Sequence, residues 1–321
     1  MNDSNLKYQI IYDIISAEDN VLNVKELCEV AGVSRSGYYA WVNAEPNRIK
    51  RELQDQKDFN LILEAFQYRG YDKGVRGIHM RLLHTGVLMN QKKIRRLMRK
   101  YNLSCPVRRQ NPYRQMIRAM KTNSISDNLV NREFKEHGPR TILLTDITYI
   151  RLNNEFVYLS VILDAFTKEV LSYVLSESLE IDFVLQTVNL LIQKHGSLLN
   201  SSTIIHSDQG SHYTSIKFRQ LIDDFGLRQS MSRRGNCWDN APQESFFGHM
   251  TAELKPYISN WTTLAEAKQA IDDWMDYYNN ERYQWDLAKL SPAQFYEYYT
   301  TGIYLLENHK HTLTFQVTYI T

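Results

Sequence analysis

The chain has 321 residues, enough for two or three domains, and aromatic residues make up 12% of it, which is ample for packing a core. Its three cysteines, Cys28, Cys105 and Cys237, lie far apart and form no Cys-x-x-Cys pair, which argues against a disulfide framework and against a zinc finger. The chain has no signal-peptide pattern, and no apolar run approaches the roughly 18 residues of a membrane span, so we expect a soluble protein of the reducing cytoplasm.

The net charge of +2 conceals a strongly uneven distribution of charge. Between Lys73 and Ser126 there are fourteen Lys or Arg and no Asp or Glu, so this stretch carries +14 and the remainder −12. Neutralisation of phosphates with release of counterions favours binding of such a block to DNA. The alternative is a solvated or disordered basic linker. The apolar patterning within much of the block favours DNA contact.

The first predicted module, residues 1–50, contains a helix-turn-helix pattern. A short amphipathic helix begins at Val24, Gly32 follows as a turn, and Ser34 can cap the next helix. A helical hairpin that only packs or dimerises fits this pattern equally well.

The second predicted module, residues 51–104, is basic and helical. It contains a possible spacer helix near its start, a helix over 77–83, a turn at Thr85 and Gly86, and a second helix capped by Asn90. Apolar residues form one stripe of that second helix, at Ile94, Leu97, Met98 and Tyr101. The opposite side is basic and is predicted to bind DNA through Lys92, Lys93, Arg95, Arg96, Arg99 and Lys100. Whether these residues read bases or only phosphates stays open.

The third segment, residues 105–139, has little periodicity and reads as a basic linker. Linkers of this composition can lie along DNA in an assembled complex. We therefore predict backbone contacts from Arg108 and Arg109.

Three acidic residues organise the next segment, residues 140–260. Asp146 lies in the middle of an apolar strand, and Asp208 ends a second apolar strand that breaks at Gly210. Glu244 follows after thirty-five intervening residues, inside the first turn of a helix that contains Pro242. Between them we predict strands over 156–166, 169–175 and 228–232 and helices over 181–195 and 216–225. This order brings the two Asp strands side by side.

Carboxylates converging from two strand ends and a helix suggest a metal site. Hard oxygen ligands suit Mg²⁺ or Mn²⁺, and two ions roughly 4 Å apart can clamp the attacking and leaving oxygens of a phosphoryl displacement. The alternative is that the two aspartates are strand-end turn residues and that Glu244 complements its helix dipole. A fourth acid, Asp164, is assigned to a strand end rather than to the metal site.

Two further segments carry weaker predictions. Before the Glu244 helix, Arg233 and Arg234 can hold phosphates, and Trp238 can stack on an unpaired base or simply pack. The last segment, residues 261–321, begins with a helix over 264–283 whose apolar side can pack on the core or on a second subunit. No role is assigned to residues 303–321.

The acids and their surroundings resemble a known family. Several residue runs are similar to those of IS-three-type insertion-sequence transposases, catalytic (OrfB-type) chains of the retroviral-integrase superfamily. These runs are His206 to Gly210, Gly235 to Ala241, Glu244 to Phe247, Tyr277 to Arg282 and Leu290 to Pro292. The resemblance implies an α/β fold, with an RNase H-like integrase core after small helix-turn-helix-like modules and before a helical C-terminal segment. It also implies Arg282 as a DNA contact. One departure is Thr251, seven positions after Glu244, where the family often has Lys or Arg; Lys255 is the expected substitute.

The leading hypothesis is therefore a DDE transposase that uses two Mg²⁺ ions, with Mn²⁺ as a substitute, held by Asp146, Asp208 and Glu244. The resemblance implies cleavage at terminal inverted repeats, transfer of the 3′-hydroxyl to target DNA, and a nucleoid-associated homo-oligomer that pairs the two ends. It also implies a possible upstream helix-turn-helix and coiled-coil partner joined by frameshifting. Two alternatives stay open: an inactive DNA-binding repressor and a structure-selective nuclease of the same fold.

Overall fold

The computed structural model describes residues 3–71, 73–105, 137–153, 155–232 and 241–307. The chain divides into two compact units: Met1–Glu64 with Arg95–Leu103, and Ala65–Ile94 with Ser104–Thr321. Some predicted DNA contacts lie outside the described residues, namely Arg108, Arg109, Arg233, Arg234 and Trp238.

The first unit opens with three helices, α1 (Asp3–Ile15), α2 (Val24–Ala31) and α3 (Arg35–Asn43). Asn23 and Glu26 form a capping box at the start of α2, and Gly32 adopts a left-handed φ of 65° after its end. Ser34 then caps α3 by accepting a hydrogen bond of 3.1 Å from the Gly37 N–H. The predicted order of helix, glycine turn and serine cap is confirmed. A small core closes the bundle, made of Ile11, Leu27, Cys28 and Tyr38.

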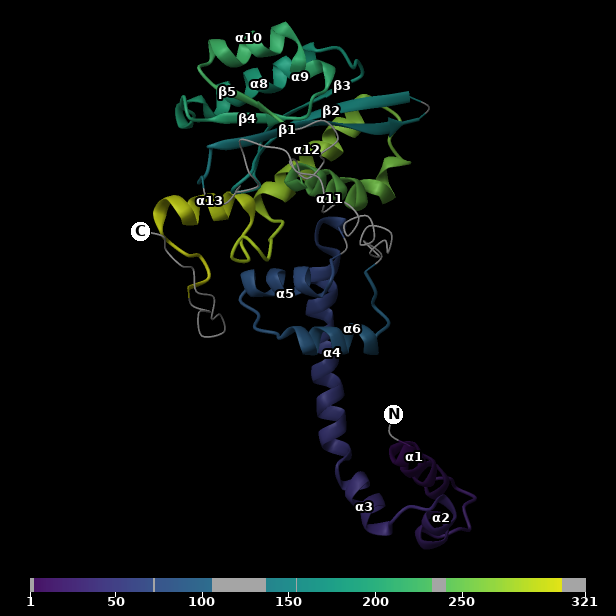
Figure 1. Ribbon diagram of the computed structural model, residues 1–321. Helices are drawn as coiled ribbons and strands as arrows, with labels where there is room; N and C mark the ends of the chain where they lie inside the picture. Colours follow the sequence, from purple (N-terminus) through teal and green to yellow (C-terminus); the bar gives the residue numbers. More distant parts are fainter. Residues whose placement is uncertain (1–2, 72, 106–136, 154, 233–240, 308–321) are drawn as a thin grey trace, which may run out of the picture. The chain divides into compact units, whose positions relative to one another are not determined.

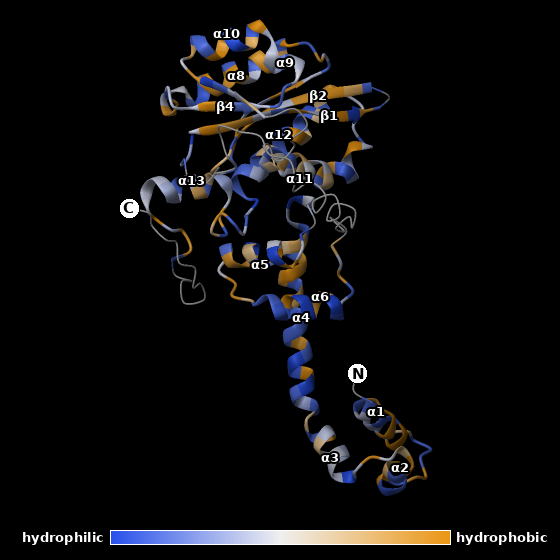
Figure 2. Cartoon of the chain, viewed as in Figure 1, coloured by the Kyte–Doolittle hydropathy of each residue, from blue (hydrophilic) through white to orange (hydrophobic). Residues whose placement is uncertain are grey.

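The long helix α4 (Glu45–Gln67) leads into a 3₁₀ turn, η1 (Tyr68–Gly70), and then α5 (Val75–His84) and α6 (Gln91–Lys100). Asn90 caps α6 as predicted, because its side chain accepts a hydrogen bond of 2.8 Å from the Lys93 N–H. The apolar stripe of α6 is buried at Ile94, Leu97 and Met98. Lys92, Arg95 and Arg99 of α6 are exposed. Much of the helix is coloured as hydrophilic in Figure 2.

A five-stranded sheet in the order β3-β2-β1-β4-β5 forms the centre of the second unit. Its strands are β1 (Ile142–Leu152), β2 (Glu155–Asp164), β3 (Val170–Ser176), β4 (Ile204–Ser207) and β5 (Arg228–Met231). The strands β1, β2 and β3 pair antiparallel, whereas β4 runs parallel to both β1 and β5. The predicted neighbourhood of the first and fourth strands is confirmed by this order.

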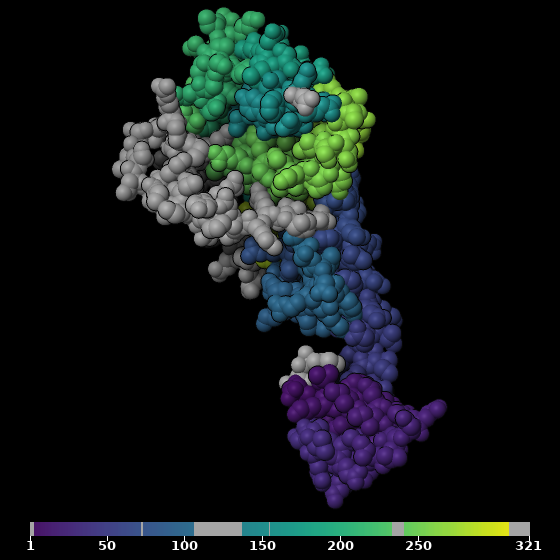
Figure 3. All heavy atoms as spheres, turned by 90° about the vertical axis from the view of Figure 1, so that its right-hand side faces the viewer, coloured from purple at the N-terminus to yellow at the C-terminus, as the bar shows by residue number. Residues whose placement is uncertain are grey.

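Helices cover both faces of the sheet (Figure 1). One face packs against α8 (Asp182–His195), α9 (Ser211–Thr214) and α10 (Ile216–Asp224), with η2 (Gly196–Leu198) after α8. The other face packs against α11 (Ala241–Ile258) and α12 (Leu264–Asn280) around Phe246 and Trp274. Sheet and helices form one continuous body in the space-filling view (Figure 3). The buried sheet holds Asp146 and the α11 face holds Glu244 within this body.

The helix α13 (Pro292–Thr301) was not predicted. Ser291 is its N-cap, Pro292 lies in its first turn, and Gln294 completes a capping box. These residue types at these positions are a helix-start signal that the sequence did contain. Among the helices of the described residues, none is long and apolar enough to cross a membrane.

Candidate active site

Asp146 lies in the middle of β1, opposite Val161 of β2. Its carboxylate accepts a hydrogen bond of 2.8 Å from the Ile147 N–H and is partly buried. The strand forms at this position because its neighbours Leu143, Leu144 and Ile150 are apolar and buried. An acid here is therefore fixed by a rigid strand rather than by a loop.

Asp208 follows β4 directly and is exposed. β4 pairs with β1 from Ile204 to His206, and the same register continued by two residues sets Asp208 opposite Asp146. The Gly210 N–H donates a hydrogen bond of 2.8 Å to the Asp208 carboxylate. A Cβ at position 210 would lie 2.9 Å from that carboxylate oxygen, so glycine permits the close approach.

Glu244 is exposed in the first turn of α11, as predicted. It lines a shallow pocket together with Asp146, and the same pocket is lined by Gly248, Thr251 and Lys255 of α11. These four α11 residues recur at helical spacing and therefore share one face of the helix. Lys255 thus lies on the acidic face, where it was expected to replace the missing basic residue at position 251.

The electrostatics show that the three acids interact. Burial raises the pKa of Asp146 to about 7, the Ile147 N–H opposes that change, and the negative charges of Asp208 and Glu244 add to the increase. The buried hydroxyl of Tyr213, 3.4 Å from the Thr145 hydroxyl, also has a raised pKa, chiefly from burial and then from the charges of Asp146 and Asp208. The sheet and α11 therefore bring together the three acids that the sequence singled out.

The three carboxylates do not yet form a ligating set. Among the described residues, no group of three or more His, Cys, Asp or Glu side chains is arranged to hold a metal ion. The donor chemistry nevertheless fits a divalent ion: the carboxylates supply hard oxygens, and their mutual repulsion would be relieved by a cation.

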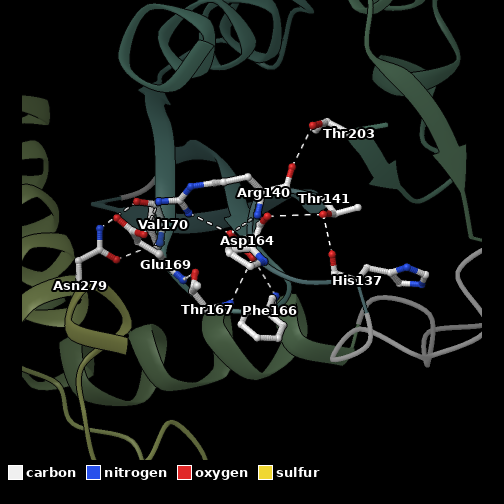
Figure 4. Close-up of polar contacts among 11 residues, drawn as sticks. His137, Arg140, Thr141, Asp164, Phe166, Thr167, Glu169, Val170, Thr203 and Asn279 are labelled. Carbon is white, nitrogen blue, oxygen red and sulfur yellow. Dashed lines mark hydrogen bonds and ion pairs between the residues drawn. The ribbon is translucent and has the colours of Figure 1, made fainter. Parts of the chain in front are cut away.

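Asp164, the fourth acid, has a different environment (Figure 4). It ends β2, which confirms its assignment to a strand end, and it is fully buried. The Arg140 guanidinium lies 2.9 Å from the Asp164 carboxylate and 2.6 Å from that of Glu169. The backbone N–H groups of Phe166 and Thr167 also donate to Asp164. Its charge is thus compensated within the fold.

Arg282, which the family resemblance implies as a DNA contact, has internal partners, and so does Asn279, three residues before it. Arg282 lies 2.8 Å from Glu253, donates to His249 over 2.7 Å, and has a side chain only 14% exposed. Asn279 bonds to both the N–H and the carbonyl of Val170, at 2.9 and 2.8 Å, and so fastens α12 to β3. Sequence reasoning missed both roles because the partners are distant in the chain.

The basic side of α6 also divides into two groups. Arg96 forms two hydrogen bonds of 2.7 Å with Asp55, and Lys100 contacts both Asp55 and Glu52, at 2.8 and 2.5 Å. These pairs belong to the first unit. The side chains of Lys92, Arg95 and Arg99 are exposed.

Comparisons with known proteins agree with this architecture. The chain matches the integrase core domain family over residues 136–237, a second integrase core domain family over 225–292, and the HTH-like domain family over 52–111. These matches cover the sheet with its acids, the helices α11 and α12, and the basic helices α5 and α6.

The chain is similar to several curated proteins across most of its length. It is 31% identical over 276 residues to the insertion element IS600 uncharacterized 31 kDa protein of Shigella sonnei, covering 85% of this chain and 98% of that protein. It is 30% identical to the putative transposase InsK for insertion sequence element IS150 of Escherichia coli, covering 84% and 92%. It is 27% identical to the transposase InsF for IS3A of the same species, covering 88% and 97%.

The matching solved structures are more distant. A simian T-cell lymphotropic virus intasome chain, in complex with the PP2A regulatory subunit B56 gamma, matches 74% of this chain and 73% of its own, with 18% identity and a TM-score of 0.46. The HTLV-2 integrase catalytic core domain in complex with magnesium matches 49% and 97%, with a TM-score of 0.39.

The sheet order, the acids brought together at β1, β4 and α11, and the two integrase core matches define an RNase H-like integrase core of the DDE class, which acts on DNA strands. The chain belongs to the IS-three-type insertion-sequence transposases. It is a DNA transposase with an HTH-like segment before its catalytic core.

Proposed function

We propose that Asp146, Asp208 and Glu244 are the catalytic residues and that they hold two Mg²⁺ ions, for which Mn²⁺ can substitute. The observation that carries this proposal is geometric: Asp146 and Glu244 line one pocket, and the register of β1 with β4 continues to Asp208 opposite Asp146. The raised pKa of Asp146, caused by burial and then by the two other acids, agrees with it. A protein stabilises such a group of like charges at a cost unless a cation joins it. When bound, the ions activate the attacking water or 3′-hydroxyl and stabilise the leaving oxygen.

Other parts of the chain position the three carboxylates and bind the DNA. β1 fixes the direction of the Asp146 carboxylate, and the Gly210 N–H orients that of Asp208. Glu244 approaches from α11, and Lys255, about three turns further along the same face, is suited to bind a DNA phosphate. The reaction proposed is cleavage at the terminal inverted repeats followed by transfer of the 3′-hydroxyl to target DNA.

We also propose how the protein assembles with DNA for cleavage and strand transfer. The exposed basic residues of α6 bind DNA, and further contacts come from residues outside the described ranges, namely Arg108, Arg109, Arg233, Arg234 and Trp238. A homo-oligomer pairs two element ends in the cytoplasm, at the nucleoid. An upstream helix-turn-helix and coiled-coil segment joined by frameshifting would strengthen end binding. The HTH-like match over residues 52–111 supports the DNA contact. The domain boundaries proposed are 1–50, 51–104, 105–139, 140–260 and 261–321.

The test is a strand-joining assay with Mg²⁺ on oligonucleotides that carry the ends of the element encoding this chain. The parent should cut and join, and Asp208→Asn should lose roughly 10³-fold or more of both activities, because several kcal/mol of transition-state stabilisation disappear. Asp224→Asn, an exposed acid on α10, is the matched control and should retain activity.

The same assay separates the alternatives. Cutting without joining identifies a structure-selective nuclease. Binding of the ends without cutting by the parent identifies an inactive repressor. Equal product from the parent and Asp208→Asn would remove the metal-site assignment.

A further inference from the structure

A cavity of about 790 Å³ lies within the second unit, beside the helix that carries Glu244. It is bounded by the start of α5, the first turns of α11 and the segment that follows α12. Ala241, Ser245 and His249 of α11 line this cavity, whereas Glu244 and Gly248 line the acidic pocket. One helix therefore separates the two sites, which lie about one helix diameter apart, on the order of 10 Å.

The walls of the cavity are fixed by internal contacts. Arg81 lies 3.6 Å from Glu281, and Lys168 lies 2.8 Å from Asp286. The rings of His84 and Tyr283 stack with centroids 3.6 Å apart and planes 4° from parallel, which ties α5 to the segment after α12. The cavity is therefore preformed, and these cations have carboxylate partners within the wall.

Trp285, also in the wall, has different neighbours. The Arg76 guanidinium lies 5.6 Å from the indole centroid, and the Lys289 ammonium lies 4.9 Å from it. Arg76 is exposed, whereas Lys289 is only 6% exposed and its pKa is lowered by burial. Within the described ranges, no carboxylate forms an ion pair with either side chain. Arg76 and Trp285 both line the cavity, whereas Lys289 does not, so the cavity presents one exposed cation beside an indole. This pair favours a ligand with both a planar ring and a negative charge.

We propose that this cavity binds one unpaired nucleotide of the DNA strand next to the bond that is cut, with its base against Trp285 and its phosphate at Arg76. A volume of 790 Å³ is typical of a site for a small ligand and is far too small for a duplex. Stacking on an aromatic ring tolerates any base, so the site would hold the strand without reading its sequence. The inference rests on the proposed DNA cleavage for its biological setting.

The experiment uses the full chain in EDTA, so that no strand cleavage is needed. A single-stranded oligothymidylate carrying one 5-iodouracil is bound and irradiated, and the adducts are mapped by peptide mass spectrometry. The expected adduct is on Trp285. Its yield should fall roughly fivefold or more in Arg76→Met, because a phosphate contact is lost. Lys217→Met, an exposed cation on α10 across the sheet, is the control and should leave the yield unchanged.

A second pair of variants guards against a folding defect. Trp285→Phe keeps a ring and should preserve affinity for a single-stranded oligonucleotide at the site, whereas Trp285→Ala should weaken it by roughly 5- to 100-fold. Adducts confined to residues 92–100, or equal yields in Arg76→Met and Lys217→Met, would overturn the proposal. Full competition by thymidine monophosphate at equal nucleotide concentration would also overturn it, since it would indicate a site for free nucleotides. Cross-linking that succeeds in a chain without strand-transfer activity would leave this site standing and remove only the proposed catalysis.

Discussion

Two aspartates on neighbouring strands, Asp146 on β1 and Asp164 at the end of β2, have opposite surroundings. Asp164 faces the Arg140 guanidinium and three backbone N–H groups, so its charge is neutralised by the fold. Asp146 faces Asp208 and Glu244, so its charge is opposed by its neighbours. The difference teaches that a buried acid paired with arginine maintains the structure, whereas a buried acid beside other acids needs a cation supplied from outside.

The largest expected effect on stability concerns Arg140. Replacing it in Arg140→Met leaves the Asp164 carboxylate buried without its cation, which should cost roughly 3 to 5 kcal/mol of unfolding free energy. Urea unfolding followed by circular dichroism measures this change. Arg151→Met, an exposed residue of β1, should change the same quantity by less than about 0.5 kcal/mol. A cost below about 1 kcal/mol for Arg140→Met would contradict the structural role of the pair.

A smaller effect, of opposite sign, is expected at Asp146. The folded carboxyl holds its proton up to about pH 7, whereas the ordinary pKa is 3.8. Its contribution to stability is therefore complete below pH 3.8 and is lost as the pH rises through about 7, by roughly 2 kcal/mol after solvent screening. Asp146→Asn should abolish this dependence and make the metal-free protein more stable at pH 8.

The measurement is urea unfolding in EDTA at several pH values from 5 to 8. Asp224→Asn should keep the pH dependence of the parent. If Asp146→Asn and the parent lose stability equally over this range, the raised pKa is not the cause.

The smallest expected effects concern DNA binding by α6. On this helix, cations that are paired with carboxylates can be compared with cations that are exposed. Arg95→Ala with Arg99→Ala should lower the slope of log affinity for DNA against log salt by about 2, roughly one per phosphate contact. Arg96→Ala with Lys100→Ala removes residues already paired with Asp55 and should lower the slope less, with a stability cost of about 1 kcal/mol or less. Filter binding at several salt concentrations compares the two double variants. Equal slopes would show that the internal pairs do not restrain these side chains.

The positions of the three acids in strands and a helix could be predicted from the sequence. The ion pairs formed by other charged residues could not. Asp146 and Asp208 stand in or after apolar strand patterns, and Glu244 follows a helix-start signal, so local pattern sufficed to predict their elements. The partners Arg140 and Asp164 are 24 residues apart, and Arg96 and Asp55 are 41 apart. Only the folded chain brings such pairs together, because their attraction depends on geometry that no local pattern encodes. The helix that begins at Pro292 could have been predicted from local sequence, because its capping residues are adjacent to it in the chain, but this signal was overlooked.

The hydrogen-bonded pairing of β1 with β4 covers only Ile142 to Leu144, whereas β1 remains paired with β2 as far as Leu152. Asp146 and Asp208 therefore both lie beyond the last registered pair of these two strands, Leu144 with His206. On its other side β4 stays paired with β5 as far as Ser207, and the Ser232 N–H donates a hydrogen bond of 2.8 Å to the Ser207 carbonyl. The backbone just before Asp208 is therefore anchored to the sheet through β5, on the side of β4 that faces away from Asp146.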